Sequence, residues 1–310
     1  MPLAPVNEID LATAWRLSKI IRQWKPQIVH AHDPHAVSMA ALALSFGSPD
    51  PRPKTIASRR VDFHLQSHTF SQWKYRQVDG FIAASEAIRK IMIHDGIPGD
   101  RIDVVHDGID VEKIAHRPPA DLHAEYWLPH GVPVIVNVGA LVGHKGQKYL
   151  IDAMPLVLRE VPDAHLIIFG EGDLRAPLEK QIKHLNLTKR ILLPGFREDV
   201  LSLMKTADLF VMSSVTEGLG SAVLDAMAMG HAVVGTEAGG IPEAVVPYET
   251  GLLVATADAK PLANAIVKLL KNPELRKKYG EAGRRRVAEH FGVDRLVEGT
   301  LEVYRRVASR

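Results

Sequence analysis

Short apolar runs alternate with longer amphipathic stretches along most of this chain, and this rhythm most constrains the fold. The runs have the length of buried strands, and the stretches have the period of helices that cover a sheet. The loops between them, of about two to six residues, are normal for strand–helix–strand units. The pattern predicts an α/β fold with parallel sheets covered by helices on both faces. The predicted strands are 27–31, 54–58, 80–84, 101–105, 134–139, 165–170, 190–193, 208–213, 232–235 and 251–254.

The organisation of the chain predicts two domains joined by a linker. Segment 108–133 carries four prolines and no clear periodicity, which is typical of a domain boundary. We therefore expect a first, incomplete Rossmann-like domain over 1–115 and a second over 116–292. A last helix over 293–310 is expected to cross back to the first domain. The other predicted helices are 11–24, 85–94, 147–160, 221–229, 260–270 and 273–290.

Composition excludes several classes of protein. The 310 residues suit two domains of roughly 100–200 residues each. A balance of 38 Lys and Arg against 36 Asp and Glu gives no overall positive field, so we expect no nucleic-acid partner. The absence of cysteine excludes disulfides, a thiolate nucleophile and Cys-ligated zinc. No apolar run reaches about 18 residues and the start lacks a signal-peptide pattern, so we expect a cytoplasmic protein.

The window 208–243 carries the strongest functional signal. A buried strand runs through a glycine-punctuated turn into a helix, and a helix N-terminus offers free N–H donors to a phosphate. Glu217 precedes the helix and Asp225 lies inside it, roughly 9 Å further along the axis at ~1.5 Å per residue. These carboxylates leave a phosphate-sized gap. The same residues also allow a simpler interpretation, in which Glu217 caps the helix and Asp225 is solvated.

This window resembles the Glu-x7-Glu region of the retaining GT-B glycosyltransferases of family four, also called glycosyl transferases group 1. Further stretches match in order, so the resemblance covers nearly the whole chain; they are 30–33, 104–110, 138–153, 168–172 and 193–199. It implies a GT-B fold of two Rossmann-like doubly wound domains facing a cleft, the first on the acceptor side and the second binding a nucleotide sugar. It also implies sugar transfer, with retention, from a nucleotide-diphosphate sugar to a glycan, lipid or small molecule. The resemblance favours a UDP-sugar over a GDP-sugar, and implies neither a metal nor a cofactor.

The resemblance assigns roles around the turn and the first glycine-rich loop of the second domain. Glu217 would hold hydroxyls of the donor sugar, and Asp225, where the family usually has Glu, would hold the ribose. Lys145 matches the Lys that binds the diphosphate, although a surface Lys in a basic loop would look the same. The turn residues expected to bind the donor are Gly218, Leu219, Gly220 and Ser221.

Other loops complete the expected donor site. Phe196 and Arg197 lie in the loop that packs against the base in relatives, and Gly170 and Gly172 would let the chain approach the nucleotide, unless they form an ordinary turn. Ala140 stands where many members carry a phosphate-binding Arg. Either Arg175 or Arg197 replaces it, or donor affinity is weak.

The first domain offers histidines and a basic segment. His30 and His32 share one face of strand 27–31; by resemblance His32 stands beside the reacting sugar, whereas a chance cluster of histidines is the open alternative. The two histidines could suggest a metal site, but no third ligand follows them at a matching spacing. Segment 52–90 has eight Lys and Arg against three acids. It is either a solvated basic face or a surface for an anionic or lipid-linked glycan on the inner membrane face, with Arg59 and Arg60 on the acceptor side.

Family members place a strand, a glycine-rich loop, a helix and another strand before the region matched by 9–33. We therefore expect a shortened first domain whose bare edge, near 27–31, is covered by a second copy or another partner. Slow or absent transfer by the isolated chain is expected. The rival functions are a nucleotide-sugar-binding module without transferase activity, a sugar-nucleotide epimerase and a glycan phosphorylase.

Overall fold

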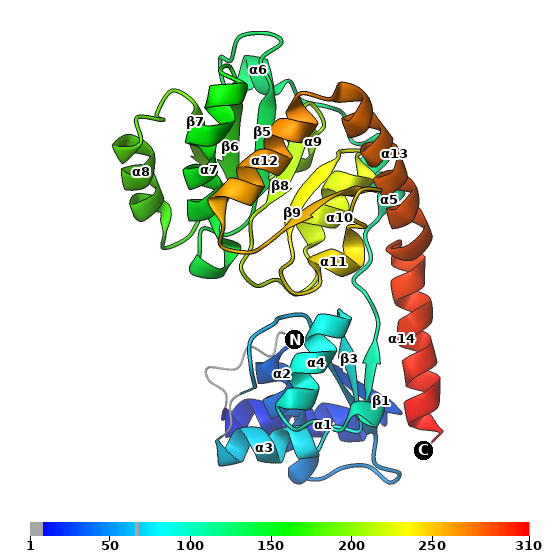
Figure 1. Cartoon of the computed structure of the whole chain (residues 1–310). Helices are drawn as coiled ribbons and strands as arrows, with labels where there is room; N and C mark the ends of the chain where they lie inside the picture. Colours follow the sequence, from blue (N-terminus) through cyan, green and yellow to red (C-terminus); the bar gives the residue numbers. More distant parts are fainter. Residues whose placement is uncertain (1–8, 66–67, 310) are drawn as a thin grey trace. The chain divides into compact units, whose positions relative to one another are not determined.

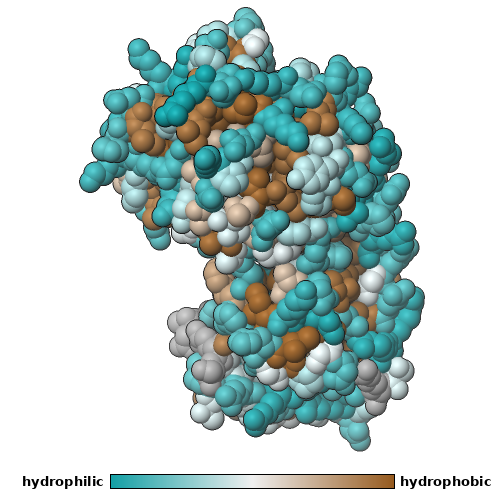
Figure 2. All heavy atoms as spheres, in the orientation of Figure 1, coloured by the Kyte–Doolittle hydropathy of each residue, from teal (hydrophilic) through white to brown (hydrophobic). Residues whose placement is uncertain are grey.

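The computed structural model describes residues 9–65 and 68–309, which form two compact units (Figure 1). The first unit comprises the residues up to His106 together with those from Asp294 onward, and the second comprises Asp107–Val293. The chain therefore passes from one unit to the other twice. Figure 2 shows that hydrophilic side chains dominate the visible surface, with smaller apolar patches between them, as expected when each core faces inward.

The first unit is built on a parallel four-stranded sheet with its strands in sequence order: β1 (Ile28–Ala31), β2 (Lys54–Arg59), β3 (Gly80–Ala83) and β4 (Ile102–Val104). Side chains alternate between its faces. Ala57 and Phe81 pack with the helices α2, α3 and α4, whereas Ile56 and Ile82 pack with the last helix, α14. The helices of this unit are α1 (Leu11–Trp24), α2 (Pro34–Ser45), α3 (Thr69–Arg76), α4 (Glu86–His94) and α14 (Val293–Ala308), with the short helix η1 (Gly99–Arg101) before β4.

The second unit is built on a parallel six-stranded sheet in the order β10-β9-β8-β5-β6-β7. Its strands are β5 (Val134–Val138), β6 (His165–Phe169), β7 (Ile191–Gly195), β8 (Leu209–Met212), β9 (Val233–Thr236) and β10 (Gly251–Val254). Its helices are α5 (Val111–His116), α6 (Leu122–Glu125), η2 (Gly143–Lys145), α7 (Gln147–Glu160), α8 (Arg175–His184), α9 (Val200–Met204), α10 (Ser221–Ala228), α11 (Ile241–Ala244), α12 (Ala259–Leu270) and α13 (Pro273–His290). One face packs against α7, α8 and α12 and the other against α10, α11 and α13, with a buried core on each side. This is the doubly wound order that reverses direction between β5 and β8.

Seven α-helices of the described residues were not predicted, and α2 shows why; the seven are α2, α3, α5, α6, α8, α9 and α11. Asp33 caps α2 by accepting the N–H groups of His35 and Ala36. The helix is apolar on several sides, because seven of its twelve residues are buried, so it lacks the one-sided pattern that marks a surface helix. Of the other six, α3 and α8 are short and largely polar.

The segment predicted as a linker, 108–133, is folded in the structure. It contains α5 and α6, whose Ile114 and Leu122 are buried in the core of the second unit. The division between the units falls at 106–107, earlier than the expected boundary at 115. Proline spacing marks irregular backbone, but two buried apolar side chains are enough to join a segment to a core.

Candidate active site

The sheet of the second unit opens where its strand order reverses. β5 and β8 pair at Ile135–Leu209 and at Val136–Phe210. Past these pairs, the buried Asn137 bridges the strands by donating from Nδ2 to the carbonyl of Val211 at 2.8 Å. Ligands of open α/β sheets bind outside the carboxyl ends of the strands at such a switch point. The segments that follow β5 and β8 are therefore the place for a site.

Lys145 follows β5, Glu217 follows β8, and the two side chains meet at the switch point. Lys145 Nζ donates to Glu217 Oε2 at 2.6 Å, and Ser214 Oγ donates to the same oxygen at 3.0 Å. The side chain of Glu217 is 10% exposed and that of Lys145 is 20% exposed. Water therefore screens this pair less than it screens a surface ion pair. The structure joins two residues that the sequence analysis assigned to one site.

Backbone contacts hold the two loops together. The carbonyl of His144 accepts the N–H of Val215 at 2.7 Å, and Ser213 Oγ donates to the carbonyl of Lys145 at 3.2 Å. Gly146 has φ 65°, and a Cβ there would lie 2.1 Å from the Ser213 carbonyl oxygen. A residue without a side chain is needed for this close approach. The backbone thus fixes the position of Lys145 without a ligand.

The turn of Gly218–Ser221 opens α10 beside this pair. Gly220 precedes the helix with φ 91°, and no side chain of the described residues caps it. The first N–H groups of α10 are therefore oriented as in other anion-binding helix N-termini. Leu219 is only 3% exposed and belongs to the core, so any contact from it to a ligand must come from its backbone.

Asp225 lies in the second turn of α10 and is half-buried. Burial raises the pKa of Asp225 to about 6, against a smaller opposing effect of the charge on Arg117. A carboxylate in such surroundings gains from hydrogen-bond donors that replace the lost water. The paired hydroxyls of a ribose are donors of this kind.

A cavity of about 360 Å³ opens at the carboxyl ends of β5 and β6. Val138, Phe169 and the 71% exposed ring of Phe196 give it apolar walls. Gly170 lines it too, and a Cβ there would lie 2.0 Å from the Gly139 carbonyl oxygen. Gly172 is equally constrained, by Leu141. These glycines let the loops after β5 and β6 touch, and the space between apolar walls suits an aromatic ring.

Both arginines considered as replacements for the missing cation at Ala140 are engaged elsewhere. Arg197 pairs with Asp199 through two bonds of 2.8 Å and with Glu125 at 2.6 Å, and these acids raise its pKa further above the ordinary value. Arg175 lies 3.1 Å from Glu179 and donates to the carbonyl of Leu193 at 2.8 Å. Lys145 is thus the cation that the structure directs at the switch point.

In the first unit, His32 follows β1 and lines a smaller cavity with Arg59 and Arg60. Its ring centroid lies 4.1 Å from that of His30. His30 is fixed on both sides, with Nδ1 at 2.7 Å from Tyr304 Oη and Nε2 at 2.8 Å from Ser58 Oγ. Burial, followed by the charges of His32 and Arg60, lowers the pKa of His30 to about 4. His30 is therefore neutral near pH 7.

The basic segment 52–90 is only partly a charged surface. Lys74 is buried and donates to the carbonyl of Pro34 at 3.2 Å and to Ser38 Oγ at 3.1 Å. Arg59 is also buried and donates to the carbonyl of Phe63. Lys54 pairs with Asp79 at 3.8 Å and Arg89 with Glu86 at 3.0 Å. Arg52, Arg60, Arg76 and Lys90 are the exposed basic residues of the segment.

Sequence reasoning missed the residues that position the pair rather than form it. Ser214, His144 and Asn137 had no assigned role, although each lies at the carboxyl end of a predicted strand or in the loop after it. That location was the available signal, because side chains there converge at a switch point. In the described part of the chain, no three His, Asp or Glu side chains are grouped to hold a metal ion. None of the described helices is long and apolar enough to cross a bilayer.

Comparison with known proteins places this chain in a family. The profile of the glycosyl transferases group 1 family matches residues 120–286, more than half of the chain. The chain belongs to this family. The profile of glycosyltransferase family 4 matches residues 1–113. Membership identifies the chain as a glycosyltransferase and confirms the resemblance drawn from its motifs.

Individual relatives agree with this assignment. The N-acetyl-alpha-D-glucosaminyl L-malate synthase of Bacillus anthracis is 25% identical over 95% of this chain and 78% of its own length. The putative glycosyltransferase EpsD of Bacillus subtilis is 28% identical over 97% and 82%. Among solved structures, a glycosyltransferase from Rickettsia africae superposes with a TM-score of 0.84 at 22% identity, over 99% of this chain and 84% of its own. Anabaena HepE in complex with UDP-glucose gives 0.80 at 22% identity, over 96% and 82%. The predicted α/β fold of GT-B type is confirmed.

Proposed function

We propose that this group 1 glycosyltransferase moves a sugar from a UDP-sugar to a hydroxyl of an acceptor glycan or lipid-linked acceptor, with retention of configuration. The observation that carries the proposal is the Lys145–Glu217 pair at the switch point of the second sheet, beside the N-terminus of α10. The solved complexes of Anabaena HepE with UDP and with UDP-glucose support the choice of donor. Retention rests on the resemblance of the Glu217-to-Asp225 spacing to retaining members.

In the proposed function, different residues bind the diphosphate, the sugar, the ribose and the base of the donor. Lys145 and the first N–H groups of α10 bind the diphosphate and offset the negative charge that grows on it as the sugar departs. Glu217 accepts hydrogen bonds from sugar hydroxyls. Because Ser214 also donates to Glu217, the carboxylate stays oriented when Lys145 turns to the phosphates. Asp225 accepts hydrogen bonds from the ribose hydroxyls, and the cavity beside Phe196 binds the base.

We assign the acceptor to the first unit. His32, Arg59 and Arg60 line one cavity there, which gives an acceptor both a titratable side chain and positive charge. β1 is an edge strand that pairs with β2 in the described sheet. We propose that a second copy or another partner covers this edge.

One observation favours a second candidate function, a nucleotide-sugar-binding module with little transferase activity. Ala140 stands where relatives carry a cation, and Arg175 and Arg197 are held by acids and carbonyls of their own. Lys145 then faces the diphosphate without a second cation, which would slow departure of the leaving group. The two functions differ in turnover rather than in binding.

Incubation with radiolabelled UDP-glucose and a panel of neutral, phosphorylated and lipid-linked acceptors tests the proposal. We expect UDP release that depends on acceptor, with a product of the same anomeric configuration as the donor by NMR. Donor binding without UDP release would establish the binding module instead. Equal thermal stabilisation by UDP, GDP and ADP, or inversion at the anomeric carbon, would contradict the donor or the stereochemistry.

A further inference from the structure

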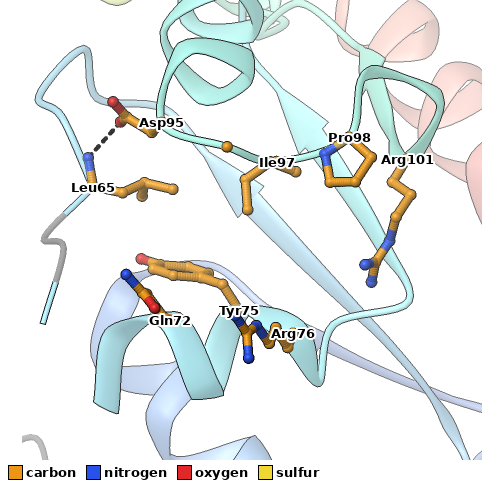
Figure 3. Close-up of a pocket in the computed structure, with 9 residues that line it drawn as sticks. Leu65, Gln72, Tyr75, Arg76, Asp95, Ile97, Pro98 and Arg101 are labelled. Carbon is orange, nitrogen blue, oxygen red and sulfur yellow. Dashed lines mark hydrogen bonds between the residues drawn. The ribbon is translucent and has the colours of Figure 1, made fainter. Parts of the chain in front are cut away.

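A cavity of about 380 Å³ between α3 and the turn that follows α4 in the first unit has no part in the function proposed so far (Figure 3). We call it the α3–α4 cavity. Gln72, Tyr75 and Arg76 line it from α3, and Arg101 lines it from η1. Ile97 and Pro98, in the turn after α4, add apolar walls. Its volume is in the range of small-molecule sites.

Two guanidinium groups line the α3–α4 cavity without an ion-pair partner. The side chains of Arg76 and Arg101 have no carboxylate or hydrogen-bond partner among the described residues. Arg101 Cζ lies 5.8 Å from the centroid of the Phe81 ring, and this contact holds its side chain. Exposed arginines are common, but two unpaired ones on the wall of one cavity are a source of positive potential.

The one carboxylate in the wall is already engaged. Asp95 accepts the N–H of Leu65 at 2.6 Å and lies 2.6 Å from His64 Nδ1. Figure 3 shows the carboxylate of Asp95 directed toward Leu65. Asp95 thus fixes the loop after β2, and the cavity keeps an excess of positive charge.

We propose that the α3–α4 cavity is an anion-binding subsite that takes a phosphate or carboxylate group of the acceptor. Arginine suits this role because its planar group offers two parallel N–H donors to such an anion. The ring of Tyr75 and the side chains of Ile97 and Pro98 contact the apolar part of the same ligand. The assignment of the anion to an acceptor rests on the proposed function.

The position of this subsite defines the length of the acceptor. Tyr75 lines both the α3–α4 cavity and the cavity of His32, so one side chain separates them. Arg101 directly precedes β4, whereas His32 directly follows β1, so the two lie at opposite ends of parallel strands. Four strand residues span roughly 13 Å at ~3.3 Å each. The acceptor is therefore an elongated molecule whose anionic group lies away from the reacting hydroxyl.

A phosphate titration tests the subsite independently of transfer. The full chain is saturated with UDP, so that the donor site is filled, and inorganic phosphate is added while the amides of Gly96 and Ile97 are followed by NMR. We expect the double variant Arg76→Gln/Arg101→Gln to bind phosphate at least about tenfold more weakly. The matched control is Arg52→Gln/Lys90→Gln, which removes two exposed cations of the same unit that line neither cavity and should bind like the wild type. Equal binding by both double variants would overturn the subsite.

Steady-state kinetics test the assignment to the acceptor. For a phosphorylated acceptor we expect the Arg76→Gln/Arg101→Gln variant to raise KM about tenfold with kcat unchanged, and to leave KM for the neutral analogue unaltered. Phosphate binding with no difference in KM would overturn the acceptor role, whereas absence of transfer by the wild type would contradict the proposed function and leave the titration result standing. Vesicle co-sedimentation identifies the source of the phosphate. If the wild type co-sediments with phosphatidylglycerol vesicles but not with phosphatidylcholine vesicles, and the variant co-sediments with neither, the phosphate belongs to a lipid-linked acceptor. Without this co-sedimentation, the phosphate belongs to a soluble one.

Discussion

Lys145 Nζ and Glu217 Oε2 lie 2.6 Å apart across the switch point of the second sheet, although 72 positions separate them in the chain. Each residue partly neutralises the other before a donor arrives. In the proposed function, a diphosphate competes with Glu217 for the ammonium group, and the sugar competes with Lys145 for the carboxylate. If the proposed function holds, the pair couples the binding of the two parts of the donor.

Replacement of Lys145 should separate nucleotide recognition into its parts. We expect Lys145→Ala to weaken UDP binding by about tenfold or more, as for loss of a charge-assisted hydrogen bond, and to leave uridine binding nearly unchanged. Isothermal titration calorimetry with both ligands measures this. Lys148→Ala is the matched control, because Lys148 is exposed at the start of α7. Equal loss of uridine and UDP binding would contradict the assignment.

Replacement of Glu217 should affect transfer more than nucleotide binding. Its proposed partner is the sugar, so Glu217→Gln should lower kcat by roughly 100-fold while UDP affinity changes only a few-fold. Loss of the negative charge also releases Lys145 toward the diphosphate, which limits any loss of UDP affinity. A variant with full transfer activity would exclude Glu217 from the reaction. Glu281→Gln, on α13, controls for removal of an exposed carboxylate from the same unit.

The raised pKa of Asp225 predicts a pH-dependent donor affinity. Below about pH 6 the carboxyl is protonated in the unliganded protein and accepts ribose hydroxyls less well. We expect UDP-glucose affinity to fall as pH decreases from 7.5 to 5. In Asp225→Asn the affinity should be lower throughout and independent of pH over this range. A wild-type profile as flat as that of the variant would refute the ribose contact.

The same pKa predicts that Asp225 lowers the stability of the free protein. The folded state favours the protonated carboxyl, so stability falls as pH rises from the ordinary carboxyl pKa to about 6 and then stays lower. Asp225→Asn should therefore raise the free energy of unfolding at pH 8, by on the order of 1–2 kcal/mol, and change it less at pH 4. Urea unfolding at the two pH values measures the difference. Equal effects at both would contradict the burial of this carboxyl.

The lowered pKa of His30 predicts acid sensitivity in the first unit. Between about pH 6.5 and 4 the unfolded chain binds a proton at this position and the folded chain does not, so stability falls as the pH falls. In His30→Gln this part of the loss of stability at low pH should be absent. Hydrogen exchange of the β1 and β2 amides at pH 7 and 5 reports it locally. Tyr304→Phe removes the 2.7 Å bond to α14, and should speed exchange in α14 at both pH values.

The sequence alone predicted those strands and helices whose own residues show a clear apolar run or a helical period. All ten predicted strands are present, because a strand buried on both faces is a continuous apolar run that needs no partner to be recognised. α7 and α13 match their predicted bounds, since one buried face produces a helical period. Family membership also followed from the sequence, because the family's motifs occur in the same order along this chain.

The tertiary structure alone decided which side chains meet. The contact of Lys145 with Glu217 depends on β5 and β8 becoming neighbours, and strand order is set by packing of the whole sheet rather than by either strand. The guanidinium group of Arg197 could bind a phosphate, but Glu125 and Asp199 hold it in ion pairs. Ile114 joined the expected linker to the second core because burial of apolar surface outweighs local turn composition. Each of these outcomes involves a contact between residues far apart in the chain, and a linear pattern of residues does not encode such a contact.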